Sequence, residues 1–492
     1  MKLVRPILAA LALSLVSTAP ALAQRTDLVL GVVLEPPHLD PTAGAAAAID
    51  EIVYANVFEG LTRIGPAGEV QPALAESWEI SDDGKVYTFK LHEGVKFHDG
   101  SDFDAEDVKF SLDRARAEDS TNAQKMLFAQ IDTVEVVDPA TVRVTLKQPQ
   151  GSFLYNMGWG DAVIVAEETA EANKDNPVGT GPFKFDNWAR GSSVTISKNP
   201  DYWGEPAMLE KAEFRFIPDV AASVPALLSE DVHAFPNMQA GDALAQIEAD
   251  PRFEVVIGST EGETILSINN GKPPFDDLKV RQAISYALNR EEIIAGNGSG
   301  LGTPIGSHFS PANDAYVDLT GAYPHDPEKA KELLKEAGHE TIEATLKLPP
   351  PAYAREGGQV IASQLRNVGI NLELIPLEWA DWLEQVFTNK DYDLSIVSHT
   401  EPNDIEIYSR PDYYFQYQNP EFNAVIEELD VTSDEAKRKE LYGKAQQILS
   451  DDAVVGFLFQ LPKIGVWDAR LEGLWENSPV QANDLTKVRW TE

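Results

Sequence analysis

Side chains of opposite charge occur in two segments that each follow an apolar, strand-like run. Arg355 ends the segment PPPAYAR (349–355), and Glu401 and Asp404 lie in SHTEPNDIEIYSR (398–410). The planar guanidinium of arginine binds a carboxylate through two hydrogen bonds, and a carboxylate pairs with an ammonium group. Arg355 also stands at the predicted start of a helix, where the helix dipole favours a negative ligand group. The two segments therefore predict a site for a zwitterion such as a short peptide, unless these charges are simply solvated.

Several uncharged or aromatic side chains add candidate ligand contacts. These are His38, Trp159, Asn269, Asn270, Tyr353 and His399. Glycines on both sides of Trp159 leave its ring accessible for stacking, although a buried packing ring is equally consistent with the pattern. The two asparagines could direct their amides at a ligand backbone or could form an ordinary turn. A histidine in a proline-fixed loop, as at position 38, is more often a plain polar residue than a ligand contact.

The motifs of common enzymes are missing from the sequence. The chain has no cysteine, so it offers neither a thiolate nucleophile nor a disulfide. It has no GxSxG, and its eight histidines form no HExxH or HxH cluster. The glycine-rich stretches at 178–181 and 296–302 fit neither phosphate-binding spacing. We expect no enzyme activity, no cofactor and no metal site; a hydrolase or a chaperone-like binder is a remote alternative.

Alternating strand and helix patterns between residues 326 and 397 position the two charged segments. Asp326-Pro327 is a helix start, and Gly338 ends that helix. Further elements follow in the order strand, helix, strand, helix, strand, at 341–348, 355–368, 370–376, 378–387 and 392–397. This alternation predicts a parallel sheet, and ligands of such sheets bind at the carboxyl ends of the strands.

The stretch from Ala73 to Arg114 contains a hairpin followed by a helix. Alternating residues at 78–80 and 86–91 predict two strands, and Asp82-Asp83-Gly84 between them predicts a tight turn. Asp104 begins the helix, and acidic residues occupy its first turn.

Composition limits the classes of protein that fit. With 492 residues and 43% hydrophobic residues, the chain is long enough for two or three folded domains. A formal charge of -39 argues against nucleic acid and anionic lipid as partners. Residues 1–23 have the charged, apolar and Ala-Leu-Ala regions of a signal peptide without a lipoprotein cysteine. We therefore expect a soluble, secreted monomer, periplasmic in a Gram-negative source, with no stable membrane insertion.

The hairpin stretch also resembles a family signature. The pattern LAESWxxxxDGxxYxFxLxxGVxFHDGxxFxAEDVxFSLDR is similar to that of extracellular solute-binding proteins of family 5, the peptide, nickel, opine and oligosaccharide receptors of ABC importers. PVGTGPF (177–183), NPDYWG (199–204) and DLKVRQAISYALNR (277–290) extend the resemblance along the chain.

The resemblance implies a periplasmic binding protein-like α/β fold of type II, cluster C, with two lobes around a ligand cleft and an extra domain. Domain I would comprise 24–54, 178–258 and 463–492. Domain II, the extra domain, would span 55–177, and domain III, the second lobe, 259–462.

Function and several residue roles follow from the same resemblance. It implies capture of a di- or oligopeptide, or a peptide-like solute, for delivery to a membrane permease. An opine, oligosaccharide or nickel chelate is the alternative ligand. Asp404 or Glu401 would hold a peptide amino terminus, and Arg355 its carboxylate. Thr180 and Gly181 would lie near the cleft, in a hinge at 178–182. The HTEPND run at 399–404 departs from the DxPDP-like run of peptide receptors.

Overall fold

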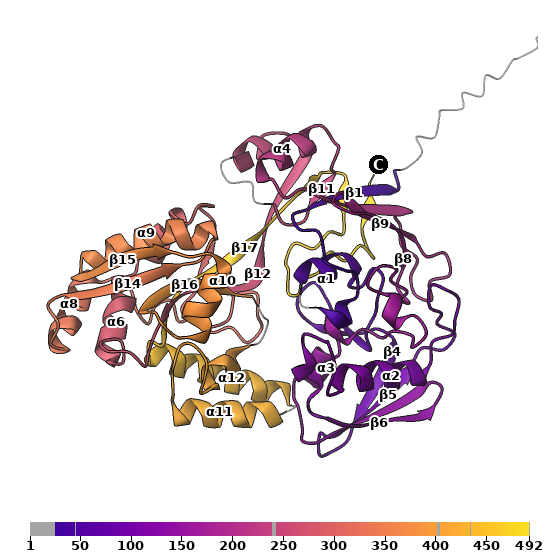
Figure 1. Cartoon of the computed structure of the whole chain (residues 1–492), viewed down its shortest axis with the longest axis horizontal. Coiled ribbons are helices and arrows are strands. Elements are labelled where there is room, and N and C mark those ends of the chain that lie inside the picture. Colours follow the sequence, from indigo (N-terminus) through magenta and orange to yellow (C-terminus); the bar gives the residue numbers. More distant parts are fainter. Residues whose placement is uncertain (1–24, 45, 239–242, 401–403, 433, 492) are drawn as a thin grey trace, which may run out of the picture.

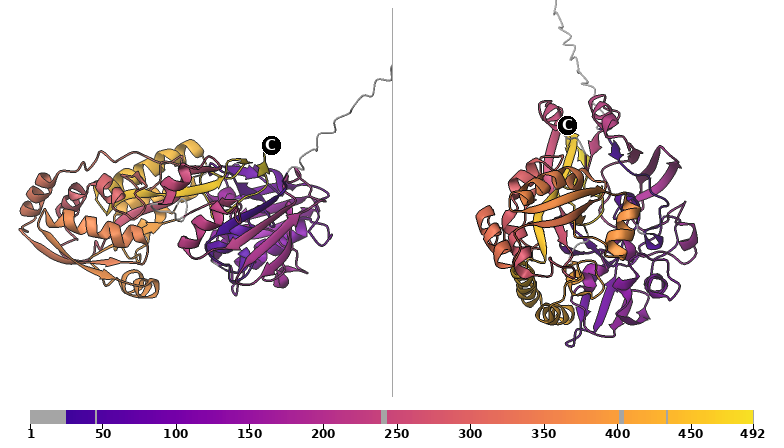
Figure 2. Two further views of the ribbon diagram at one scale, coloured as in Figure 1. Left: turned by 90° about the horizontal axis from the view of Figure 1, so that it is seen from above. Right: turned by 60° about the vertical axis from the view of Figure 1, so that its left-hand side comes forward.

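The chain folds into two lobes joined by two long strands (Figure 1). The computed structural model describes residues 25–44, 46–238, 243–400, 404–432 and 434–491, so the expected signal peptide and Glu401 lie outside the described residues. Strands β12 (Phe253–Ile268) and β17 (Val455–Asp468) run antiparallel between the lobes and belong to one mixed sheet. Seen from above, the two lobes form separate bodies, and the C-terminus lies with the first (Figure 2).

The first lobe is built partly on β1 (Asp27–Val32), which pairs in parallel with β10 (Lys211–Phe216). Alternate apolar residues of both strands enter one core, which includes Leu28, Leu30 and Phe214. The C-terminal segment completes this core through the buried ring of Trp490, whose Nε1 donates to the Asp27 carbonyl at 3.1 Å. The other elements around this sheet are α1 (Ala47–Val53), β8 (Phe183–Ala189), β9 (Ser193–Lys198), α4 (Val220–Leu228), β11 (Ala234–Phe235), α5 (Leu244–Glu248), β18 (Leu471–Glu472) and β19 (Arg489–Trp490).

A second, four-stranded sheet in the first lobe contains the predicted hairpin. Its strand order is β4-β5-β7-β6, and Gly84 in the hairpin turn has a φ of 67°. Helix α2 (Ala105–Arg116) covers it and begins with a capping box, in which the Asp107 side chain accepts from the Asp104 N–H at 2.9 Å and the Asp104 side chain accepts from backbone N–H groups of the first turn. The remaining bounds are β2 (Thr62–Ile64), β3 (Val70–Pro72), β4 (Ala75–Ile80), β5 (Val86–Leu91), β6 (Ile131–Asp138), β7 (Thr141–Leu146) and α3 (Phe153–Asn156).

The second lobe contains the predicted alternation of strands and helices. Strand β14 (Ile342–Leu348) pairs in parallel with both β15 (Ile370–Pro376) and β16 (Leu394–His399). Its helices are α6 (Leu278–Ala287), α7 (Arg290–Ala295), α8 (Pro327–Glu336), α9 (Ala352–Arg366), α10 (Trp379–Trp382), α11 (Pro420–Val431) and α12 (Glu435–Asp451), and the short β13 (Thr303–Pro304) pairs with β17. The predicted α/β fold with a parallel sheet is thus confirmed, whereas the exact domain boundaries stay a prediction.

Three local predictions need correction. Helix α9 begins at Ala352, three residues before the predicted start, and the predicted helix at 378–387 is the short α10 followed by a π-helix, Leu383–Thr388. The segment 178–182 is not the link between lobes. It packs within the first lobe, where the Gly181 N–H donates to the Val57 carbonyl at 3.0 Å, and β12 and β17 make the crossing instead.

Candidate functional site

A cavity of about 960 Å³ lies between the two lobes. The first lobe contributes Tyr54 and Trp159, and the second contributes Tyr353 and Thr400. The linking strands close one side with residues such as Glu261, where a bulge between Ser259 and Glu263 interrupts the β12–β17 pairing. Apolar and aromatic side chains with a few polar groups are typical of a pocket for a small organic molecule.

Trp159 lies in the cavity wall, as the glycines around it suggested. It stands directly before a 3₁₀ helix, Gly160–Ala162, and is only partly buried. The neighbouring backbone is fixed by Tyr54, whose hydroxyl donates to the Gly158 carbonyl at 2.7 Å and accepts from the Ile64 N–H at 2.8 Å. This hydroxyl is therefore used within the lobe, and the Trp159 ring is held ready for stacking.

The loops after β14 and β16 meet at the cavity, as the parallel sheet predicted. Tyr353 lies in the first turn of α9, and its hydroxyl accepts from the Ser398 N–H at 3.2 Å, which joins the two loops. Burial raises the pKa of Tyr353 to about 12, so the phenol stays neutral at physiological pH. Thr400 lines the same cavity.

Arg355 does not line this cavity. Because α9 starts earlier than expected, Arg355 lies within its first turn, and its side chain points to the end of β15. Nη2 donates to the Leu377 carbonyl at 3.1 Å and to Glu378 Oε1 at 3.0 Å. Arg355, which was predicted to bind a ligand carboxylate, instead forms a partly exposed ion pair with Glu378 within the second lobe.

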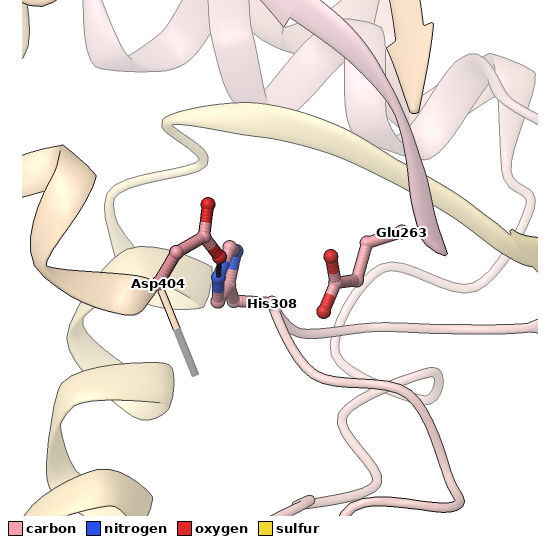
Figure 3. Close-up of side chains that lie close together, drawn as sticks. All are labelled: Glu263, His308 and Asp404. Carbon is pink, nitrogen blue, oxygen red and sulfur yellow. Dashed lines mark hydrogen bonds and ion pairs between the residues drawn. The ribbon is translucent and has the colours of Figure 1, made fainter. Parts of the chain in front are cut away.

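Asp404 is mostly buried and is paired with a histidine. Its Oδ1 lies 2.8 Å from His308 Nε2, and Glu263 faces the pair from β12 (Figure 3). Burial acts to raise the pKa of Asp404, but the His308 imidazole outweighs it and the pKa falls below its ordinary value. His399 is also buried, with Nε2 3.0 Å from the Tyr414 hydroxyl and Nδ1 4.0 Å from Asp404. These groups form an internal polar network, and neither Asp404 nor His399 lines the cavity.

The same network is the one cluster of metal-ligating residues found in the part of the chain that the structure describes. The potential ligand atoms of Glu263, His308 and Asp404 lie within 4.8 Å of one another. The direct contact between His308 Nε2 and Asp404 Oδ1, at 2.8 Å, favours a hydrogen-bonded network in this conformation.

Thr180 and Gly181 are structural residues of the first lobe. Thr180 is 0% exposed, and its Oγ1 donates to Glu59 Oε2 at 2.8 Å. Glu59 also accepts from Trp203 Nε1 at 2.9 Å and from the Tyr202 hydroxyl at 2.8 Å. At Gly181 a Cβ atom would lie 2.5 Å from the Asn56 carbonyl oxygen, so close backbone packing explains the glycine.

Asn269, Asn270 and His38 also lie outside the cavity lining. Asn269 donates through Nδ2 to the Tyr392 carbonyl at 3.0 Å, and Asn270 to the Val454 carbonyl at 3.0 Å. Both asparagines thus fix a turn inside the second lobe, which agrees with the turn-forming role that the sequence analysis gave as the alternative to ligand contact. His38 Nδ1 accepts from the Asp40 N–H at 3.3 Å, and its ring lies against Gly44, which does line the cavity.

Three acidic residues of the cavity wall were not among the predicted site residues. Asp50 lies in α1, Asp161 follows the Gly-Trp-Gly run, and Glu261 lies in the bulge of β12. The Gly-Trp-Gly-Asp sequence was the available signal at Asp161. Nothing in the sequence indicated that α1 and the 3₁₀ helix at 160–162 would meet.

None of the described helices combines the length and the apolar character needed to cross a membrane. This finding covers the part of the chain described above.

Known proteins resemble the chain over most of its length. The dipeptide-binding protein of Escherichia coli is 30% identical, with 78% of this chain and 80% of that protein covered. The glutathione-binding protein GsiB of Pectobacterium atrosepticum is 30% identical over 91% of both. Among solved structures, the periplasmic binding protein DppA from Helicobacter pylori, in complex with peptide STSA, matches with a TM-score of 0.79 at 26% identity, covering 95% of this chain and 99% of that one.

The model of one family matches residues 69–424, which includes the hairpin signature and most of the second lobe. The two-lobed α/β architecture and the cavity between the lobes agree with this match. The chain therefore belongs to the bacterial extracellular solute-binding proteins, family 5.

Proposed function

We propose that the protein captures a di- or oligopeptide, or a peptide-like amino compound, in the cavity between its lobes and presents it to the permease of an ABC importer. The observation that carries this proposal is the cavity itself, whose wall combines residues of both lobes. The relatives named above, a dipeptide-binding and a glutathione-binding protein, support the ligand class.

The size of the cavity suits a short peptide. Pockets that enclose small organic ligands commonly have volumes of about 300–1,000 Å³, and this cavity has about 960 Å³. Trp159 and Tyr353 offer flat aromatic surfaces from opposite lobes. Such surfaces accept varied side chains, which suits a receptor for a class of peptides.

The connection between the lobes supports a closing movement. Among the described residues, β12 and β17 are the paired strands that link the lobes, so bending there would change the width of the cavity. The lobes also meet at a second place, where the Gly151 N–H before α3 donates to the Asp430 carbonyl of α11 at 3.3 Å. Ligand contacts that exist only with both lobes together would stabilise this closed form and make it recognisable to a permease.

Isothermal titration of the mature protein against di- and tripeptides, an opine, an oligosaccharide and a nickel chelate tests the ligand class. We expect saturable binding of peptides and recovery of unchanged peptide by mass spectrometry. The radius of gyration from X-ray scattering should fall when the peptide is added. Binding of only a sugar, opine or chelate would contradict the peptide assignment, and conversion of the peptide into products would indicate an enzyme.

Trp159→Ala tests whether the cavity is the binding site. We expect peptide affinity to fall at least tenfold because a stacking surface is lost. Trp379→Ala is the matched control, since Trp379 is 42% exposed on α10 and does not line the cavity. Equal affinities of the two variants would place the ligand elsewhere.

We also propose that the mature protein acts as a free monomer in the periplasm. The expected signal peptide at 1–23 supports this location. Size-exclusion chromatography with light scattering tests the monomer, and N-terminal sequencing of protein from a periplasmic extract tests cleavage.

A further inference from the structure

The charged side chains of the cavity wall all have the same sign. Asp50, Asp161 and Glu261 contribute carboxyl groups, and none of the described residues that line the cavity is lysine, arginine or histidine. The chain positions outside the described residues at 45, 239–242 and 401–403 are not basic either. The described cavity lining therefore offers a ligand carboxyl groups and no basic side chain.

Two of these carboxyl groups form a pair in the first lobe. Asp50 belongs to α1, and Asp161 to the 3₁₀ helix Gly160–Ala162. Gly160 allows them to approach, because a Cβ atom at this position would lie only 2.1 Å from Asp50 Oδ1. The close approach of the two elements thus depends on a residue without a side chain.

The pair has unused hydrogen-bonding capacity. Asp161 is only 6% exposed, and its Oδ1 is buried without a hydrogen-bond partner among the described residues. The same holds for Oδ1 of Asp50. A buried acceptor without a donor destabilises the fold. A donor that arrives with the ligand would satisfy this unused capacity at the wall of the cavity.

The pKa values of the two carboxyl groups also favour a cationic ligand group. Burial raises the pKa of Asp161 to about 7. Burial and then the charge of Asp161 raise the pKa of Asp50 well above its ordinary value. The two carboxyl groups repel each other when ionised, and a positive charge between or beside them would relieve that repulsion.

We propose that Asp50 and Asp161 bind a cationic group of the ligand, an ammonium or a guanidinium, and that the receptor therefore selects positively charged peptides or amines. This inference rests on the proposed function of the cavity. Glu261 adds a third carboxyl group from the linking strand and strengthens the same preference. Burial raises its pKa, although Asn313 Nδ2 donates to it at 3.3 Å.

The cation can come from two parts of a peptide, its amino terminus or a basic side chain. Titration with Ala-Lys, Ala-Met, N-acetyl-Ala-Lys and Ala-Glu separates the two, because methionine matches the length of lysine without its charge. Putrescine and argininamide test the cation without a full peptide. A loss of binding on acetylation identifies the amino terminus, whereas a loss from Ala-Lys to Ala-Met identifies the side chain.

Asp50→Asn and Asp161→Asn are the decisive variants, and Asp186→Asn is the control, since Asp186 is exposed on β8 and does not line the cavity. We expect the wild type and the control to prefer the cationic member of a pair at least tenfold. Each cavity variant should reduce that preference to about twofold. Circular dichroism should show that all three variants are folded.

The outcomes separate this inference from the proposed function. Equal binding of Ala-Lys, acetylated Ala-Lys and Ala-Glu would overturn the cation site and leave the peptide receptor intact. Binding of putrescine or argininamide alone, lost in both cavity variants, would support the cation site and overturn the peptide assignment. Failure of every cation to bind, or an unchanged preference in both cavity variants, would overturn the cation site.

Discussion

Thr180→Val separates a structural from a ligand-binding role for the turn at 178–182. Thr180 is 0% exposed, and its hydroxyl is one of three donors to the buried carboxyl group of Glu59. Valine keeps the shape of threonine but removes the donor. A hydrogen bond to a charged or strongly polar buried group contributes about 1.5–3 kcal/mol. We therefore expect the free energy of unfolding of the first lobe to fall by about 2 kcal/mol.

Urea unfolding followed by tryptophan fluorescence measures this loss, because Trp203 donates to the same carboxyl group. Peptide affinity by titration should stay within twofold of the wild type, since Thr180 does not line the cavity. Thr388→Val is the matched control, because Thr388 is exposed and the same change should alter stability by less than about 0.5 kcal/mol. A tenfold loss of affinity with unchanged unfolding would refute the structural role and restore Thr180 as a ligand contact.

Three further variants test charge and packing. Burial raises the folded-state pKa of Asp161 from 3.8 to about 7, so the carboxyl group destabilises the fold increasingly as pH rises from about 4 to 7. Between pH 5 and 7, the free energy of unfolding of Asp161→Asn should therefore rise by roughly 2 kcal/mol relative to that of the wild type. Parallel pH curves of the two proteins in urea unfolding would contradict this. His98 should have the opposite pH dependence, because burial lowers its pKa from 6.5 to about 4 and stability is lost as pH falls through this range. In His98→Gln, the decrease in the free energy of unfolding between pH 7 and 5 should be smaller than in the wild type by about 2 kcal/mol. An unchanged decrease would contradict a neutral imidazole at position 98. Gly160→Ala places a Cβ atom 2.1 Å from Asp50 Oδ1; titration should show a reduced preference for cationic over neutral peptides, while an intact preference would show that Asp50 is not required.

Local patterns predicted the architecture well because they depend on neighbouring residues. The Asp104 cap, the Gly84 turn and the alternating strands at 342–376 follow from short-range rules. Helix α9 begins directly after Pro351, three residues before the predicted start, and Arg355 in its first turn binds Leu377 and Glu378 and does not line the cavity.

The site was harder to predict because burial and partners depend on distant segments. Asn269 and Asn270 have amides suited to ligand contact, but both donate to carbonyls inside the second lobe. Asp404 was expected to meet an ammonium group, yet His308 from another loop pairs with it. Asp50 and Asp161 are far apart in sequence, and their meeting depends on how α1 packs against the loop after α3.

The packing of Trp490 beside β1 has a consequence for how the molecule forms. The core of the first lobe contains Leu28 and Leu30 from its beginning and Trp490 from its last short strand. Until Trp490 packs against the first lobe, β1 lacks the ring that covers it and the carbonyl of Asp27 lacks its indole donor. The native packing of β1 therefore depends on a contact between residues 463 positions apart, whereas the α/β segment at 342–399 can assemble from residues close together in the chain.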